Sequence, residues 1–73
     1  MSSTTYRFDT ERLMEAAARM GDNSGYAIAR RTGLTQSAVS RILAGRRQPT
    51  LTSAALMART YSTPLDDLVG VAA

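Results

Sequence analysis

Apolar residues recur along this chain of 73 residues at the three- and four-residue spacing of α-helices, and no segment shows the alternation of a convincing strand. The first helix is predicted over residues 10–20, because Asp9 can cap its start and Gly21 can end it. Its apolar face consists of Leu13, Ala16, Ala17 and Met20. This periodicity favours an all-α fold.

Two short helices follow, and a short turn separates them. Ser24 can cap a helix that stops at Gly33. Thr35 can cap the next helix, over residues 36–44. Gly33 can adopt a positive φ without the steric cost of a Cβ, and Ala29 is small enough for the two helices to approach closely. The spacing predicts a helix-turn-helix.

Two further helices are predicted in the last third of the chain. The fourth is capped near Thr50, and Leu56 lies off its apolar stripe. That stripe consists of Leu51, Ala54, Ala55, Ala58 and Tyr61. The fifth helix has Thr63 as its N-cap and Pro64 at its first position. Its inward-facing residues are Leu65, Leu68 and Val69, and the methionines expected in or near the core are Met14, Met20 and Met57.

Length and composition narrow the possible functions. A chain of 73 residues forms one small domain. It has no cysteine and no histidine, which removes thiolate nucleophiles, imidazole bases and the commonest ligands of zinc, iron and copper. We therefore expect no enzyme, no cofactor, no metal site and no small-molecule substrate. No apolar run reaches the length of a membrane span and the start does not resemble a signal peptide, so we expect a cytoplasmic protein without a membrane partner.

Basic charge is concentrated in the middle of the chain. The chain has nine arginines, no lysine and six acidic residues, for a net charge of +3. Residues 1–23 have a net charge of −1 and residues 60–73 of −2, whereas residues 24–59 carry six arginines and no acid. Such a segment repels itself and is most simply explained by a polyanionic partner. The alternative is a solvated surface in which genome composition favours arginine.

A family resemblance rests on the residues in and around the predicted helix-turn-helix. They are Ile28-Ala29, Gly33-Leu34-Thr35-Gln36-Ser37, Val39-Ser40-Arg41-Ile42, Gly45-Arg46-Arg47 with Pro49-Thr50-Leu51, and Leu65-Asp66-Asp67-Leu68. With this combination, residues 13–69 resemble the lambda-repressor/Cro-like (XRE-class) helix-turn-helix family of prokaryotic DNA-binding regulators. The resemblance implies a compact five-helix, lambda-repressor-like domain whose partner is double-stranded DNA.

The resemblance also implies a domain organisation. Residues 1–8 are expected to form a flexible N-terminal arm, and residues 71–73 a C-terminal tail. Residues 9–70 are expected to form the DNA-binding domain, with the helix-turn-helix at residues 24–44. Within it, residues 36–44 are the recognition helix, which would lie in the major groove.

Four residues of the recognition helix are the predicted base contacts: Gln36, Ser37, Ser40 and Arg41. Gln36 can pair with the N6 and N7 of adenine, and Arg41 with the O6 and N7 of guanine. The serines are short enough to let the helix backbone approach the bases. The alternatives are that Gln36 merely starts the helix, that Arg41 holds a phosphate, and that the serines contact only the DNA backbone.

The predicted phosphate contacts flank that helix. They are Ser24, Gly25, Arg46, Arg47, Gln48 and Thr50. Arg46 and Arg47 directly follow the recognition helix, in a loop that Pro49 keeps from continuing the helix, although a solvated loop is the alternative. The helix starts at Ser24 and Thr50 offer backbone N–H groups to phosphates.

Two points about the second helix stay open at the level of sequence. Gly25 stands where many family members have a glutamine that touches phosphate, so that contact is in doubt or moves to Asn23 or Ser24. Arg30 and Arg31 point about 100° apart on a helix, so we expect only one of them to face DNA.

The function implied is a sequence-specific transcriptional regulator that binds double-stranded DNA, of the phage, prophage or mobile-element repressor type. It would bind a palindromic operator as a homodimer. The alternative is an antitoxin-like or other protein-interaction module of the same fold. Leu56 and the apolar end Val69-Gly70-Val71-Ala72-Ala73 favour that alternative, although both could equally form the seam of a homodimer.

Overall fold

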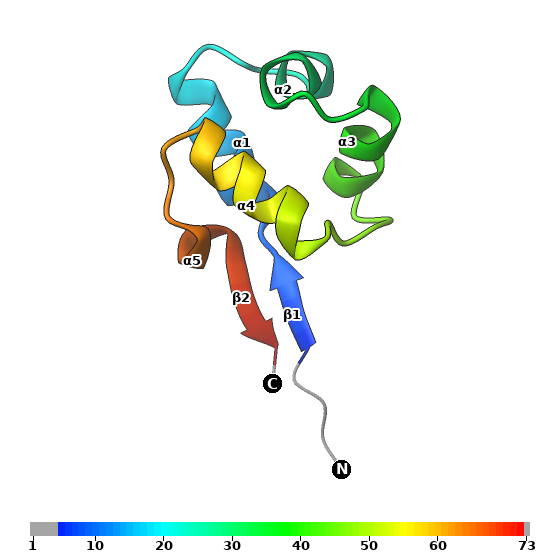
Figure 1. Ribbon diagram of the computed structural model, residues 1–73, viewed down its shortest axis with the longest axis vertical. Coiled ribbons are helices and arrows are strands. Elements are labelled where there is room, and N and C mark those ends of the chain that lie inside the picture. Colours follow the sequence, from blue (N-terminus) through cyan, green and yellow to red (C-terminus); the bar gives the residue numbers. More distant parts are fainter. Residues whose placement is uncertain (1–4, 73) are drawn as a thin grey trace.

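Five helices pack around one core, and two short strands pair the two ends of the chain (Figure 1). The computed structural model describes residues 5–72, with side chains from residue 7 to residue 70. The elements are β1 (Thr5–Phe8), α1 (Thr10–Arg19), α2 (Gly25–Thr32), α3 (Gln36–Leu43), α4 (Leu51–Thr60), α5 (Leu65–Leu68) and β2 (Val69–Ala72). Within residues 5–72, no helix has the length and apolar character needed to cross a membrane.

The first four helices start directly after the N-cap residues that were predicted from the sequence. In each, the side chain of the N-cap accepts a hydrogen bond of 3.0–3.1 Å from a backbone N–H three residues later. The caps are Asp9, Ser24, Thr35 and Thr50. Gly33 ends α2 with a φ of +83°, which confirms the predicted turn. α3 ends at Leu43 with Ala44 as its C-cap, one residue earlier than the sequence pattern indicated.

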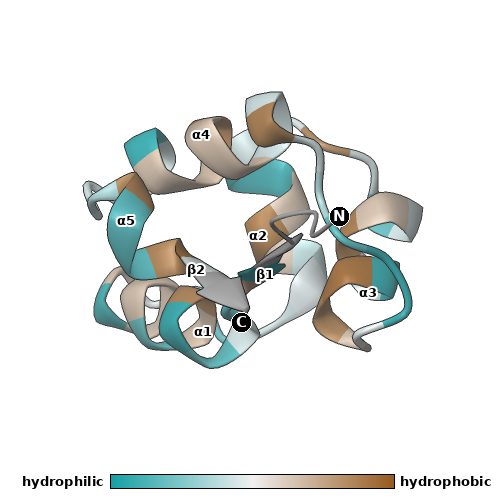
Figure 2. Cartoon of the chain, turned by 90° about the horizontal axis from the view of Figure 1, so that it is seen from below, coloured by the Kyte–Doolittle hydropathy of each residue, from teal (hydrophilic) through white to brown (hydrophobic). Residues whose placement is uncertain are grey.

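The core is built from all five helices. Leu13, Ile28, Val39, Met57 and Leu68 are the largest fully buried side chains, and each comes from a different helix. Figure 2 shows hydrophilic positions on the outer sides of α1 and α5. Burial of this apolar surface is the main favourable term in folding a domain without disulfides.

Two positions predicted to face the core are exposed instead. Met20 is 44% exposed, because it lies at the C-cap of α1, beyond the last helical turn. Leu51 is 60% exposed at the first position of α4, and Met57 is fully buried. The core face of α4 is therefore rotated towards Met57, which leaves Leu51 at its edge.

The predicted cap of α5 is also wrong. Pro64 is the N-cap of that helix, and it has no side chain that could accept a hydrogen bond. The Thr63 hydroxyl instead donates to the Tyr61 carbonyl, at 3.2 Å. Thr63 thus closes the end of α4 and does not start α5. Leu68 is buried as predicted, and Leu65 and Val69 pack against the core with partial exposure.

The prediction of no strand is wrong. β1 and β2 form an antiparallel pair in which Thr5 lies opposite Ala72 and Phe8 lies opposite Val69. Residues 5–8 of the expected arm, and residues 71 and 72 of the expected tail, thus belong to a sheet. Residues 1–4 and 73 of those segments lie outside the described residues. A four-residue strand has too few positions to show alternation, and its partner here is at the other end of the chain.

Candidate nucleic-acid interface

The turn between α2 and α3 is held by Thr32 as well as by Gly33. Thr32 is 8% exposed, and its hydroxyl donates to the carbonyl of Ile28 at 2.8 Å. The same oxygen accepts from the backbone N–H of Leu34 at 3.3 Å. This threonine therefore satisfies its own buried hydroxyl while it joins the end of α2 to the turn, which fixes the direction in which α3 leaves.

α3 has two chemically different faces, as its sequence predicted. Val39 and Ile42 are buried, and Leu43 packs against the core. The four predicted base-contact residues are all exposed: Gln36, Ser37, Ser40 and Arg41. Their exposure is a condition for reading bases, and their roles in DNA binding stay predictions.

A hollow between α2 and α3 joins the two sets of predicted contacts. It is lined by Ser24, Gly25, Tyr26, Gln36, Ser40, Leu43 and Ala44. Ser24 and Gly25 are predicted phosphate contacts, whereas Gln36 and Ser40 are predicted base contacts. The fold thus brings both sets to one surface, and none of the residues lining this hollow is acidic.

Gly25, the first residue of α2, lies against side chains of α3. A Cβ built on Gly25 would lie 3.4 Å from Leu43 Cδ1 and 3.7 Å from Val39 Cγ1. These are ordinary van der Waals distances, so alanine would also fit, whereas a longer side chain would have to leave towards solvent. The glycine therefore leaves the hollow between the two helices without a side chain at this position.

The loop after α3 presents two arginines and is tied to β1. Gly45 has a φ of +76°, and the Arg46 N–H donates to the Arg41 carbonyl at 2.9 Å, which ends the helix and turns the chain. Arg46 and Arg47 are both exposed. The side-chain oxygen of Gln48 accepts a hydrogen bond of 2.9 Å from the backbone N–H of Phe8. The side-chain NH2 of Gln48 is thus the donor with which a phosphate contact can be made.

The comparison with protein families agrees with this geometry. A family model described as helix-turn-helix, of XRE type, matches residues 15–68, which is more than half of the chain. The chain belongs to that family. It is therefore a DNA-binding transcription regulator of XRE type. Comparison with the curated proteins and with the solved structures gave no match.

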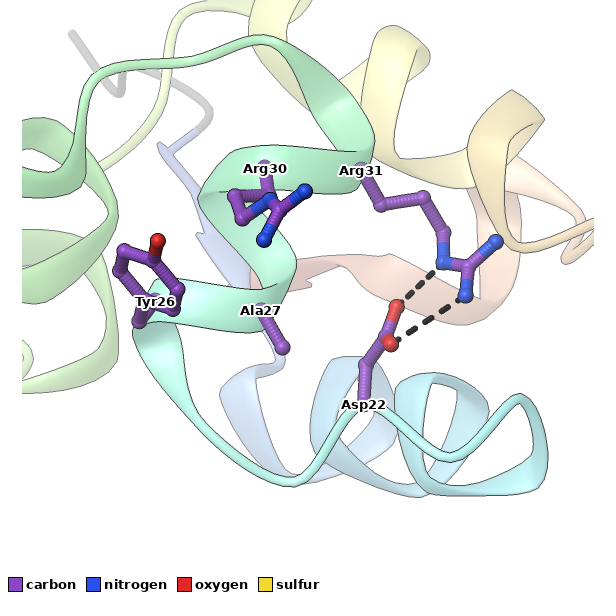
Figure 3. Close-up of a pocket in the computed structure, with 5 residues that line it drawn as sticks. All are labelled: Asp22, Tyr26, Ala27, Arg30 and Arg31. Carbon is purple, nitrogen blue, oxygen red and sulfur yellow. Dashed lines mark hydrogen bonds and ion pairs between the residues drawn. The ribbon is translucent and has the colours of Figure 1, made fainter.

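The two neighbouring arginines of this XRE-family helix-turn-helix have different roles in the structure (Figure 3). Arg31 forms an ion pair with Asp22, in which its Nη2 donates to Oδ1 at 3.3 Å and its Nε donates to Oδ2. The guanidinium carbon of Arg30 instead lies 5.9 Å from the ring centre of Tyr26. Of the two, Arg30 thus keeps its charge available for a phosphate.

Asp22 has a second partner, Tyr61, which is far away in the sequence. The Tyr61 hydroxyl donates to Asp22 Oδ2 at 2.9 Å, and Tyr61 is buried. The hydrogen bond from Arg31 lowers the pKa of Asp22, and that from Tyr61 adds to this, although burial acts in the opposite direction. Burial, followed by the hydrogen bond to Asp22, raises the pKa of Tyr61 to about 12. These three residues join the turn before α2, α2 itself and the end of α4.

This ion pair corrects the charge map drawn from the sequence. Residues 24–59 contain no acid, but Asp22 precedes them and neutralises Arg31 in space. The pairing partners are nine positions apart and lie on different elements. A helical spacing rule could not find them, since such rules cover only positions three or four apart on one helix.

Two residues at the candidate interface, Tyr26 and Arg7, are not among the contacts predicted from the sequence. Tyr26 is 56% exposed and lines the hollow with Gln36 and Ser40. Arg7 of β1 lines a second hollow together with Arg47 of the loop, next to the acidic residues Asp9 and Glu11. The sequence offered a clue to Tyr26, because it is an aromatic residue directly after Gly25. It offered none to Arg7, because β1 was not predicted.

Proposed function

We propose that this XRE-family chain is a sequence-specific transcriptional repressor of phage, prophage or mobile-element type. It binds a palindromic operator as a homodimer and inserts the recognition helix α3 (Gln36–Leu43) into the major groove. The observation that carries the proposal is the hollow between α2 and α3, where predicted phosphate and base contacts share one surface without acidic side chains. Such a regulator acts in the cytoplasm, where prokaryotic DNA lies.

In this proposal the recognition helix reads bases from its exposed face. Gln36 pairs with an adenine, and Arg41 with a guanine. Ser37 and Ser40 add short polar contacts while they allow the backbone to come close. Each bidentate pair discriminates against the wrong base by about 1–3 kcal/mol.

Phosphate contacts on both sides of α3 hold that helix in register. Arg46, Arg47 and the amide of Gln48 contact the backbone on the side of the loop, with Thr50 at the start of α4. Ser24 and Gly25 contact it on the side of α2 through backbone N–H groups and a hydroxyl. These contacts position the protein and carry no base information.

Selection of bound duplexes from a random pool tests this proposal. We expect a palindrome with half-sites about 34 Å apart. A reporter gene behind that operator should fall in expression when the protein is present. Failure to enrich any duplex would overturn sequence-specific binding, and a rise in expression would overturn the repressor role.

Salt dependence tests the electrostatic part separately. If the four arginines of each subunit that face DNA in this proposal each displace one counterion, the plot of log affinity against log salt concentration has a slope of about −7 for the dimer. These four are Arg30, Arg41, Arg46 and Arg47. A slope near zero would contradict the phosphate contacts even if a duplex were selected. Sedimentation of the free protein and of its complex would give the number of subunits in each.

A second candidate function rests on the outer face of α4. Leu51 is 60% exposed and Leu56 is 36% exposed, and both line a shallow hollow with Thr52, Ala55 and Arg59. This face would suit an antitoxin-like module that packs against another protein. Purification with a stoichiometric partner of different sequence would favour that function, whereas a homodimer that binds duplex alone would favour the repressor.

A further inference from the structure

Tyr26 is the exposed aromatic residue next to the recognition helix. Its side chain is 56% exposed, whereas the aromatic rings of Phe8 and Tyr61 are buried. It contributes little to the core, so its position is not explained by packing. A tyrosine offers a hydroxyl that donates hydrogen bonds, on a rigid ring with few rotamers to lose on binding.

The Tyr26 ring lies between two hollows. One contains Gln36 and Ser40 of α3, and the other contains Arg30 and the ion pair of Arg31. Figure 3 shows Tyr26 and Arg30 together on one side of α2, and Arg31 turned away towards Asp22. Tyr26 therefore connects the recognition helix to the one arginine of α2 whose charge is not paired.

Arg30 is held by the ring and not by an acid. Its guanidinium carbon lies 5.9 Å from the centre of the Tyr26 ring, within the range of a cation–π interaction. Among residues 7–70, the only ion pair joins Arg31 to Asp22, so Arg30 has no carboxylate partner there. A cation–π contact orients a guanidinium without neutralising it, so Arg30 can still bind an anion.

We propose that Tyr26 and Arg30 form a phosphate-contact pair on α2, in which the Tyr26 hydroxyl donates to a DNA phosphate oxygen and Arg30 neutralises the same or the next phosphate. This pair adds two side-chain contacts to those that Ser24 and Gly25 are proposed to make through backbone N–H groups and the Ser24 hydroxyl. The inference rests on the proposed DNA binding and extends the interface by two residues across α2.

Three variants of the full chain test this proposal: Tyr26→Phe, Arg30→Ala and, as a matched control, Arg19→Ala. Arg19 is an exposed arginine in the last turn of α1, and that end of α1 lies on the far side of the molecule from α3 (Figure 1). Affinity is measured by fluorescence anisotropy for the selected duplex and for a scrambled duplex of equal length, over a series of salt concentrations. Thermal unfolding of each variant checks the fold.

The two changes have different expected signatures. Tyr26→Phe removes one uncharged hydrogen-bond donor. It should therefore lower the affinity for both duplexes about tenfold and leave the salt slope unchanged. Arg30→Ala removes one phosphate neutralisation in each subunit, so the slope of the dimer should fall in magnitude by about 1.8. Arg19→Ala should resemble the wild-type protein in both measurements.

The outcomes separate this inference from the proposed function. If the wild-type protein binds duplex and both α2 variants behave like Arg19→Ala, the pair is overturned and DNA binding stands. If Tyr26→Phe changes the preference between duplexes, Tyr26 contacts a base and its backbone role is wrong. A wild-type protein that binds no duplex overturns both proposals.

Discussion

The two sides of the recognition helix are anchored to the rest of the molecule in different ways. On the side of α2, Arg31 is used inside the protein, in the ion pair with Asp22. On the side of the loop, Arg46 and Arg47 are both exposed, and the uncharged Gln48 makes the anchoring contact to Phe8. The loop thus keeps both of its arginines for a partner, whereas α2 keeps one of two.

This difference distinguishes the arginines that are available to bind DNA from the one that stabilises the fold. The charge of an arginine that is paired with a carboxylate is already compensated. Such an arginine could bind a phosphate only if its ion pair were broken, which would cost stability. An uncharged glutamine holds the loop without using any charge. We therefore expect the loop to dominate the electrostatic part of DNA binding and α2 to contribute less.

The largest expected effect comes from breaking the loop side. Arg46→Ala combined with Arg47→Ala should reduce the affinity for every duplex by about a hundredfold or more at 0.15 M salt, because four phosphate contacts of the dimer are lost. The salt slope should fall in magnitude from about −7 to about −3.6. Titrations with selected and scrambled duplexes measure both. A loss confined to the selected duplex would mean that the loop reads bases.

The next effect concerns the helix between the two sides. Gln36→Ala should relax the preference at one base position in each half-site, with about 1–3 kcal/mol of discrimination lost there. Affinity for scrambled duplex should stay nearly constant, since no charge is removed. Repeating the duplex selection with the variant measures this. If Gln36→Ala lowered affinity for all duplexes equally, Gln36 would be a backbone contact.

A third effect tests the anchor on the side of α2 through pH. The pKa of Asp22 is lowered in the folded protein, so its contribution to stability is present above the ordinary value of about 4 and is lost as pH falls through the folded value. At the alkaline end, the pKa of Tyr61 is raised to about 12, so its contribution is complete below about pH 10 and is lost between about 10 and 12. Denaturant unfolding over pH 2–6 and 9–12 measures both windows.

Substitutions separate these two windows. Asp22→Asn should lower stability at neutral pH and flatten the acidic fall relative to the wild-type protein. Tyr61→Phe should flatten the alkaline fall and reduce the acidic one only in part, because the hydrogen bond from Arg31 is the larger cause of the lowered pKa of Asp22. Equal acidic profiles of Asp22→Asn and the wild-type protein would show that the ion pair does not contribute to stability.

The smallest effect compares two glycines of α2. Gly33 has a φ of +83°, where a Cβ is strained, so Gly33→Ala should lower stability by about 1 kcal/mol. Gly25 is helical, and a Cβ there meets only ordinary contacts, so Gly25→Ala should raise stability by up to about 1 kcal/mol. Denaturant unfolding measures both. Equal losses for both variants would contradict the packing at Gly25.

Much of the fold was predictable because its signals are local. Ser24 and Thr35 accept hydrogen bonds from N–H groups three residues away, and Gly33 ends α2 by its own φ. Such features depend on a few consecutive residues and can therefore be recognised in a sequence. Leu51 shows the limit, since its apolar character predicted burial whereas its place at the start of α4 leaves it exposed.

The exposure of the recognition-helix face was predictable from the sequence, but the pairing of the charges next to it was not. The exposed face of α3 follows from helical periodicity, which puts Val39 and Ile42 on the opposite side. That Arg31 is neutralised and Arg30 is not depends on where the turn before α2 brings Asp22. Tyr26 received no role from the sequence, because its place between two hollows appears only when α2 and α3 are packed together.

By itself, the sequence determined the five helices, the caps of four of them, the turn and the two faces of the recognition helix. These follow from residues within about four positions of one another, where backbone geometry and side-chain hydrogen bonds act locally. Only the tertiary structure decided which arginines are paired, how Gln48 holds β1 and that the chain ends form a sheet. Those contacts join Asp22 to Arg31 nine positions away, Asp22 to Tyr61 39 positions away and Phe8 to Gln48 40 positions away, so they exist only after the helices have packed.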